Sequence, residues 1–193
     1  RPVDLRNLRI IKQKHEIENI KKACAIGDKA FLFIVKQIKL GVSERALADK
    51  LETFINSEGA DFSFKPIVAF GKNSSVPHHL SRDSKLKNNQ IVLLDFGVKV
   101  NNYCSDITRT VFFGSASAEF KRIYSAVLEA QAKAIQYINS QLFARDIDKI
   151  ARDYIVKQGY PTIPHSLGHG VGVEVHEAHH LAPNSKDKIK QGM

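Results

Sequence analysis

"IVLLDFGVKVNNYCSDITRT", residues 91–110, places one aspartate inside an apolar run and a second aspartate eleven positions later. Asp95 lies between Leu94 and Phe96, where its neighbours predict a buried strand. Burying an unpaired carboxylate is costly, so such groups neutralise, pair with a partner or bind a metal ion. Aspartate is also depleted in strands, and this position therefore needs a chemical explanation.

Two β-rich runs, residues 91–100 and 101–111, meet at a pair of asparagines, which predicts a β-hairpin. If the strands pair symmetrically about this junction, Asp95 lies directly opposite Asp106, with Cβ atoms roughly 4.5–5.5 Å apart. Like charges so close repel each other unless a cation lies between them, which favours one or two divalent ions. A slipped register would instead direct one aspartate to solvent, and the sequence leaves this alternative open.

The rest of the chain predicts an α+β fold. Apolar residues recur at helical spacing over four segments: residues 15–40, 43–58, 117–139 and 144–157. Gly41 ends the first of these helices, and Ser43 begins the second. Residues 65–79 predict a short strand followed by a loop, and the glycine- and proline-rich residues 159–177 lead into another short strand. Helices grouped against an antiparallel sheet are the expected architecture.

Composition narrows the class of protein and its partners. A chain of 193 residues suits one domain, and no apolar run approaches the eighteen or so residues of a membrane span. The net charge is +9, but the basic residues near the N-terminus are mixed with acids and lack interleaved aromatics. This pattern favours a solvated helix face, so we expect neither a nucleic-acid nor a membrane partner. Cys24 and Cys104 lie in dissimilar contexts, which predicts reduced thiols and a cytoplasmic location.

The histidines cluster near the end of the chain. Five of the eight lie in residues 165–180, namely His165, His169, His176, His179 and His180. Two more, His78 and His79, end the motif "VPHH". A histidine cluster together with two carboxylates favours Mn, Zn, Co or Fe, and histidines that are not ligands can bind a carbonyl or transfer protons. A pH-dependent interface and an adventitious metal-binding surface are the alternatives.

The motifs "LLDFGVKVNNYCSDITRT", "HSLGHGVGVEVHE" and "VPHH" together resemble the pita-bread metallopeptidases. Within that family they resemble the branch of Xaa-Pro aminopeptidases and Xaa-Pro dipeptidases (prolidases). The spacing agrees, with 17 residues from His78 to Asp95, 11 from Asp95 to Asp106 and 7 from His169 to His176. The resemblance spans nearly the whole chain and implies the pita-bread fold, an antiparallel sheet covered by helices.

The resemblance also implies roles for individual residues. Asp95 is expected to bind one metal ion, Asp106 to bridge two, and His169 to bind the second. Thr108 is expected to lie near the metals and to support a ligand. The non-ligand histidines that contact the substrate and stabilise the tetrahedral intermediate are expected to be His78, His165 and His176. The remaining histidines are expected at the rim or on the surface: His79, His179 and His180.

The activity implied is hydrolysis of the first peptide bond of a peptide with proline at its second position. The expected cofactors are two divalent ions, Mn, Co or Zn, which lower the pKa of a bridging water. Two further glutamate ligands of the family follow a "GM" pair, and this sequence ends at "KQGM". We therefore expect residues 1–193 to be most of one catalytic domain, without the preceding N-terminal domain and the final strands. Such a fragment should be inactive alone, and its exposed sheet edge should favour a homodimer.

Two other readings remain at this stage. Methionine aminopeptidase shares the five ligands of the family, although the "VPHH" loop favours the proline-specific branch. A non-catalytic pita-bread binding module is the alternative from another class, and the basic charge of the chain is compatible with it. Such modules typically lose metal ligands, whereas Asp95, Asp106 and His169 are all present. Two glutamates beyond Met193 at the family spacing would indicate an enzyme.

Overall fold

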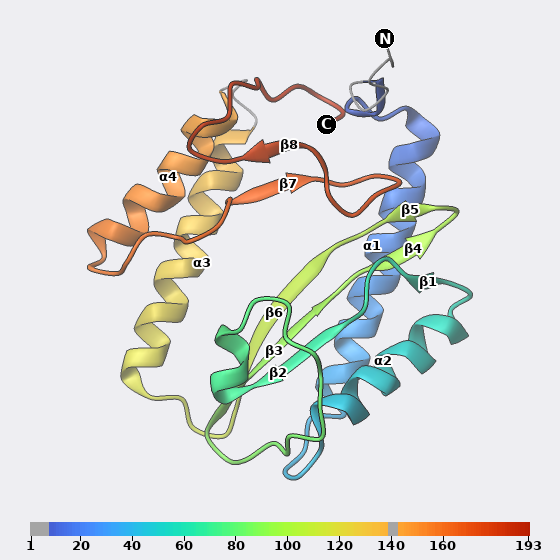
Figure 1. The fold of residues 1–193 in the computed structure, drawn as a ribbon, viewed down its shortest axis with the longest axis vertical. Coiled ribbons are helices and arrows are strands. Elements are labelled where there is room, and N and C mark those ends of the chain that lie inside the picture. Colours follow the sequence, from blue (N-terminus) through green and yellow to red (C-terminus); the bar gives the residue numbers. More distant parts are fainter. Residues whose placement is uncertain (1–7, 139–142) are drawn as a thin grey trace. The chain divides into compact units, whose positions relative to one another are not determined.

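A computed structural model describes residues 8–138 and 143–193 of the chain (Figure 1). These residues form two compact units. The sheet unit consists of residues 14–116 and 172–175. The helix-pair unit consists of the described parts of residues 1–13, 117–171 and 176–193.

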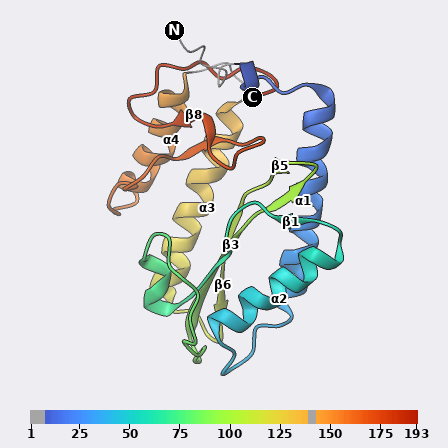
Figure 2. The same ribbon diagram turned by 45° about the vertical axis from the view of Figure 1, so that its right-hand side comes forward.

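The sheet unit contains two α-helices, one short 3-10 helix and two small antiparallel sheets. Its helices are α1 (Lys14–Val35), α2 (Glu44–Ser57) and the short 3-10 helix η2 (Gly71–Ser75). Its strands are β1 (Asp61–Phe62), β2 (Ile67–Phe70), β3 (Gln90–Phe96), β4 (Val98–Val100), β5 (Tyr103–Cys104) and β6 (Ile107–Phe113). One sheet has the order β2-β3-β6 and the other β1-β4-β5. Figures 1 and 2 show α1 and α2 on the same side of the β2-β3-β6 sheet.

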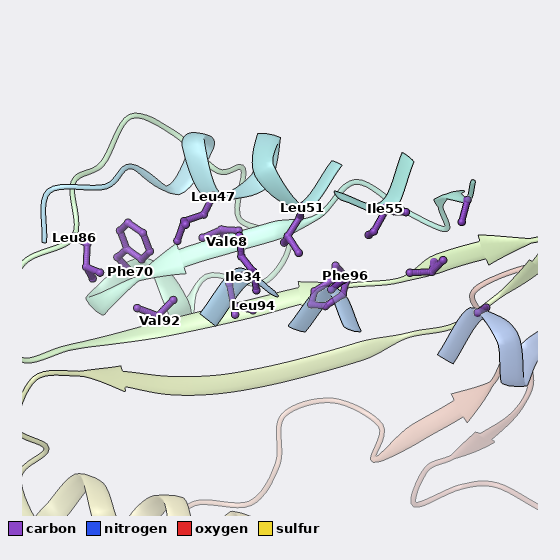
Figure 3. Packing of buried hydrophobic residues seen from close by; sticks show 14 residues of the cluster. Ile34, Leu47, Leu51, Ile55, Val68, Phe70, Leu86, Val92, Leu94 and Phe96 are labelled. Carbon is purple, nitrogen blue, oxygen red and sulfur yellow. The ribbon is translucent and has the colours of Figure 1, made fainter. Parts of the chain in front are cut away.

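The core of the sheet unit lies between these helices and the sheet (Figure 3). Helix α2 contributes residues at every fourth position, Leu47, Leu51 and Ile55, and all three are fully buried. This spacing places them on one helical face. They belong to one cluster with Ile34 of α1 and with alternate residues of the sheet, which are Val68, Phe70, Val92, Leu94 and Phe96. The side chain of Ser43 accepts a hydrogen bond from the Ala46 amide, so the predicted start of this helix is confirmed.

The predicted register of the hairpin is wrong. Asp95 pairs with Thr108, and Val100 pairs with Tyr103, so the turn consists of Asn101 and Asn102 rather than lying between residues 100 and 101. Both asparagines have positive φ, 48° and 68°, as a two-residue hairpin turn of the favoured hand requires. The whole register therefore moves by two residues, and Asp106 lies diagonal to Asp95 instead of opposite it.

The hairpin is also interrupted at Gly97, between β3 and β4. A Cβ atom at this glycine would lie 2.0 Å from the Ser105 carbonyl oxygen, closer than any side chain permits. The close approach of the two backbones therefore requires glycine here. It divides one predicted ribbon into strand pairs that belong to two different sheets.

The helix-pair unit contains α3 (Ala118–Ile138), α4 (Ala144–Lys157), β7 (Gly168–Gly170) and β8 (Glu177–Leu181). Small residues at every fourth position of α3, Ala126, Ala130 and Ala134, are buried. Two of them share a core cluster with the apolar face of α4, which consists of Ile147, Ala151 and Ile155. Strand β7 pairs antiparallel with β8, and His169 lies opposite His180.

The structure confirms the α+β class, and its helices cover antiparallel sheets as predicted. Helix α4 has the predicted bounds and α3 begins one residue after its predicted start, whereas the predicted end of α3 at residue 139 lies outside the described residues. Helix α1 differs, because it ends at Val35 rather than near residue 40. The amide of Gln37 bonds to the Ile34 carbonyl in a tighter turn, which stops the helix before Gly41.

Candidate metal centre

Asp95 lies near the end of β3 and is half-buried. Its cross-strand neighbour Thr108 donates a hydrogen bond from Oγ1 to Asp95 Oδ1 over 3.0 Å. A hydrogen bond to one carboxylate oxygen restricts the rotation of the carboxylate, as the partner of a metal ligand does. Asp106 directly precedes β6 and is exposed. The sheet unit thus provides two carboxylates on neighbouring strands.

His169 and His176 lie close together in the helix-pair unit. Their ring centroids are 4.3 Å apart, with 48° between the ring planes. The Nδ1 atom of His169 lies 3.0 Å from the Gly170 carbonyl oxygen, which can only accept, so Nδ1 carries the proton. The neutral ring then has its lone pair on Nε2, the tautomer in which a histidine binds a metal through that atom.

His165 lies on the loop between α4 and β7. Two charged residues of α4 anchor this loop. Arg152 makes a two-point ion pair with Asp148, at 2.6 and 3.0 Å, and Asp148 is fully buried. The same guanidinium donates to the carbonyl oxygens of Ile163 and His165. The Leu167 amide donates to Asp148 over 3.2 Å, so this pair holds the loop on both sides of His165.

The segment that directly follows His176 is anchored in a similar way. Glu177, the first residue of β8, is buried and accepts hydrogen bonds from Arg9 and from Lys12, the latter over 2.8 Å. Lys12 is only 8% exposed. The prediction that the N-terminal basic residues form a solvated face is therefore wrong for Lys12, which neutralises a buried carboxylate.

His78 lies in the loop that follows η2, and its side chain is exposed. The next residue, His79, contacts the carboxylate of Glu44 through Nε2 at 2.8 Å. The side chain of His79 is only 10% exposed, so the expectation that it lies on the surface is wrong. His179 also differs from that expectation, because its largely buried ring pairs with Asp187 at 2.9 Å. His180 is exposed, as expected.

Burial acts to raise the pKa of Glu44, but hydrogen bonds from Asn73, His79 and two backbone amides outweigh it and lower that pKa. Glu44 is therefore ionised at neutral pH. Sequence reasoning missed this residue because "SER" at positions 43–45 reads as an ordinary helix start. An acid in the first turn of a helix is usually solvated, and its burial here follows from the packing of β2 and its loop.

The predicted site residues divide between the two units. The sheet unit holds His78, Asp95, Asp106 and Thr108, whereas the helix-pair unit holds His165, His169 and His176. Carboxylates and a neutral imidazole are the donors that Mn, Fe, Co and Zn accept, so the chemistry of this set fits a divalent ion.

Residues 18–193 match metallopeptidase family M24, and the chain belongs to this family. Membership in a metallopeptidase family implies divalent metal ions. Within residues 8–138 and 143–193, no helix has both the length and the apolar character needed to cross a membrane.

The proteins similar to this chain include Xaa-Pro dipeptidases and an X-Pro aminopeptidase. A Xaa-Pro dipeptidase of Pyrococcus furiosus is 40% identical over 191 residues, which are 98% of this chain and 55% of that protein. The crystal structure of an X-Pro aminopeptidase from Thermotoga maritima superimposes with a TM-score of 0.93 at 37% identity, covering 97% of this chain and 54% of that one. The structure of a Xaa-Pro dipeptidase from Bacillus anthracis superimposes with a TM-score of 0.93 at 41% identity. The match covers 98% of this chain and 54% of that one. The chain thus spans about half the length of these relatives.

Proposed function

We propose that the protein carrying this chain is a dinuclear-metal peptidase that hydrolyses the N-terminal peptide bond of Xaa-Pro peptides or dipeptides. The observation that carries the proposal is the match of residues 18–193 to metallopeptidase family M24. Three side chains of suitable chemistry, Asp95, Asp106 and His169, are present in that span. The names of the Pyrococcus furiosus and Thermotoga maritima relatives support the choice of Xaa-Pro substrates.

In this proposal, Asp95, Asp106 and His169 would hold two divalent ions. When bound, ions such as Mn, Co or Zn polarise the substrate carbonyl and lower the pKa of a bound water. Thr108 orients the Asp95 carboxylate through the 3.0 Å hydrogen bond. The hydrogen bond of His169 Nδ1 to the Gly170 carbonyl orients the ring and fixes its tautomer.

The other histidines act on the substrate. His165 and His176 donate hydrogen bonds to the oxygen of the scissile carbonyl as negative charge develops on it. The loops beside both residues are held by buried ion pairs, Asp148 with Arg152 and Glu177 with Lys12, which suits donors that must be fixed before the reaction. His78 contacts the bound peptide.

The leaving nitrogen of an Xaa-Pro bond is a tertiary amide without N–H. A site for this bond must therefore recognise the shape of the proline ring and the free α-amine of the first residue. We propose a cytoplasmic location, because Cys24 and Cys104 are free thiols, as is usual in a reducing compartment.

The test uses the full-length protein after chelation and reloading with Mn, Co or Zn. Ala-Pro and Ala-Pro-Ala measure dipeptidase and aminopeptidase activity, and Met-Ala-Ala is the control for a methionine aminopeptidase. We expect metal-dependent hydrolysis of a proline peptide, lost with EDTA, and little turnover of Met-Ala-Ala. Preference for Met-Ala-Ala would identify the methionine-specific enzyme. No hydrolysis with any of the three metals would favour a binding module.

Residues 1–193 alone should bind metal weakly and show no turnover. Three side chains are few for two ions, because each divalent ion takes at least four ligands and site geometry must be held to within about 0.5 Å. We further propose that the isolated chain dimerises through an exposed sheet edge. Sedimentation of the purified chain, with a parallel peptide assay, measures both properties. EDTA-sensitive turnover by this chain would contradict the statement that three side chains are too few to hold two catalytic ions.

A further inference from the structure

We propose that Glu44 is a positioning residue that holds the segment from Phe70 to Arg82 and thereby fixes the place of His78. The inference rests on the proposed function, because that function gives His78 its contact with the substrate. Glu44 itself is too deeply buried to contact a peptide: its residue is 0% exposed.

The Glu44 carboxylate has four partners, and all of them belong to this segment. Its Oε1 accepts hydrogen bonds from the Phe70 amide over 2.9 Å and from Asn73 Nδ2 over 2.8 Å. Its Oε2 accepts from the Arg82 amide over 3.2 Å and lies 2.8 Å from His79 Nε2. An ionised carboxylate accepts about four hydrogen bonds, so these partners use its whole capacity. One buried group therefore fixes both ends and the middle of the segment.

His78 has a backbone conformation that needs such support. Its φ is +56°, in the left-handed region, which is unfavourable for a residue with a side chain. Conformations of this kind cost on the order of 1–3 kcal/mol and persist only where the surroundings impose them. The His79 amide bonds to the Val76 carbonyl over 3.2 Å, and the His79 ring is tied to Glu44. These contacts fix the peptide unit that follows His78, while its own side chain remains exposed.

A purely structural role explains this arrangement poorly. The apolar face of α2 already provides Leu47, Leu51 and Ile55 to the core, all fully buried. A buried charge in a core seldom adds stability compared with an apolar residue of the same volume. What the carboxylate adds is a unique conformation of the loop, since its partners lie at four separate points along residues 70–82.

Glu44→Gln is the main test, in the full-length protein loaded with metal. The glutamine side chain has the same volume as glutamate and keeps one acceptor oxygen. Its NH2 group replaces the other oxygen, so the two groups that donated to that oxygen lose their acceptor. We expect kcat for the proline peptide to fall about tenfold to a hundredfold, because a shift of about 1 Å in a substrate-contacting group has an effect of this size. Metal content should not change.

Two further variants separate positioning from folding. His79→Gln keeps an N–H donor toward Glu44 and should retain nearly normal kcat, whereas His79→Leu removes the donor and should resemble Glu44→Gln. This pair also carries the test if Glu44→Gln fails to fold. Ile55→Ala is the matched control. Ile55 lies on the same helix as Glu44 and is fully buried, and its truncation to alanine leaves a cavity away from the loop. This substitution should lower the melting temperature yet leave kcat unchanged well below that temperature.

Hydrogen exchange in the metal-free protein gives a readout that does not depend on activity. Amides of residues 71–82 should exchange faster in Glu44→Gln than in wild type, and Ile55→Ala should not show this local effect. Unchanged kcat and exchange in Glu44→Gln would overturn the inference, as would an equal loss of kcat in Ile55→Ala. An inactive wild type would instead overturn the proposed function, and the exchange data would still decide whether Glu44 anchors the segment.

Discussion

Thr108→Val removes one hydrogen bond to Asp95 while it preserves the shape of the side chain. The bond is 3.0 Å long and its acceptor is charged. Hydrogen bonds to charged groups contribute about 1.5–3 kcal/mol, and loss of a partner of a metal ligand typically costs about 10–100-fold in affinity. We therefore expect the metal affinity of the full-length protein to fall by about one to two orders of magnitude.

Isothermal titration of the metal-free protein with Mn measures this change. Thr108→Ser keeps the hydroxyl group and should bind Mn nearly as well as wild type, which makes it the matched control. The melting temperature of the metal-free protein should barely change, because Thr108 is exposed and valine suits a strand. Equal Mn affinities in Thr108→Val and wild type would refute the reasoning that this hydroxyl supports a ligand.

Three further outcomes are expected. Asp106→Ala should abolish activity in the full-length enzyme while the fold persists, and elemental analysis beside a melting curve tests this; normal metal occupancy and turnover would contradict the bridging role. His176→Ala should lower kcat about 100–1,000-fold with metal content unchanged, whereas loss of metal would make His176 a ligand. Because folding lowers the pKa of Glu44, its contribution to stability is complete above the ordinary glutamate pKa and is lost as the pH falls through the folded-state pKa. The difference in unfolding free energy between wild type and Glu44→Gln should shrink over that acid range, and a constant difference would contradict the lowered pKa.

The helices could be predicted from the sequence because their apolar residues repeat with a single period. Helix α4 has the predicted bounds, and Ser43 caps α2 as its position suggested. The hairpin register could not be predicted in the same way. The register depends on both asparagines of the turn adopting positive φ. It also depends on the close approach of the Gly97 backbone to the Ser105 carbonyl oxygen, which the pattern of apolar residues does not indicate.

Asp95 and Asp106 could be suspected as ligands because aspartate inside a strand is chemically unusual, whereas the choice of His169 among the clustered histidines came from the family resemblance. The groups that hold the neighbouring loops could not be named from the sequence. Glu44, Asp148 and Lys12 each lie in a segment that reads as an ordinary charged helix end or surface. Their buried carboxylate or ammonium groups contact residues 26, 19 and 165 positions away, respectively. Only the folded chain reveals that these charges lie inside it.

We propose that Asp95, Asp106 and His169 together hold two metal ions. Anomalous diffraction from crystals of the full-length protein loaded with Mn tests it most directly. We expect two neighbouring anomalous peaks, with Asp95 on one, His169 on the other and Asp106 on both. A single peak, or metal bound without Asp106, would contradict it.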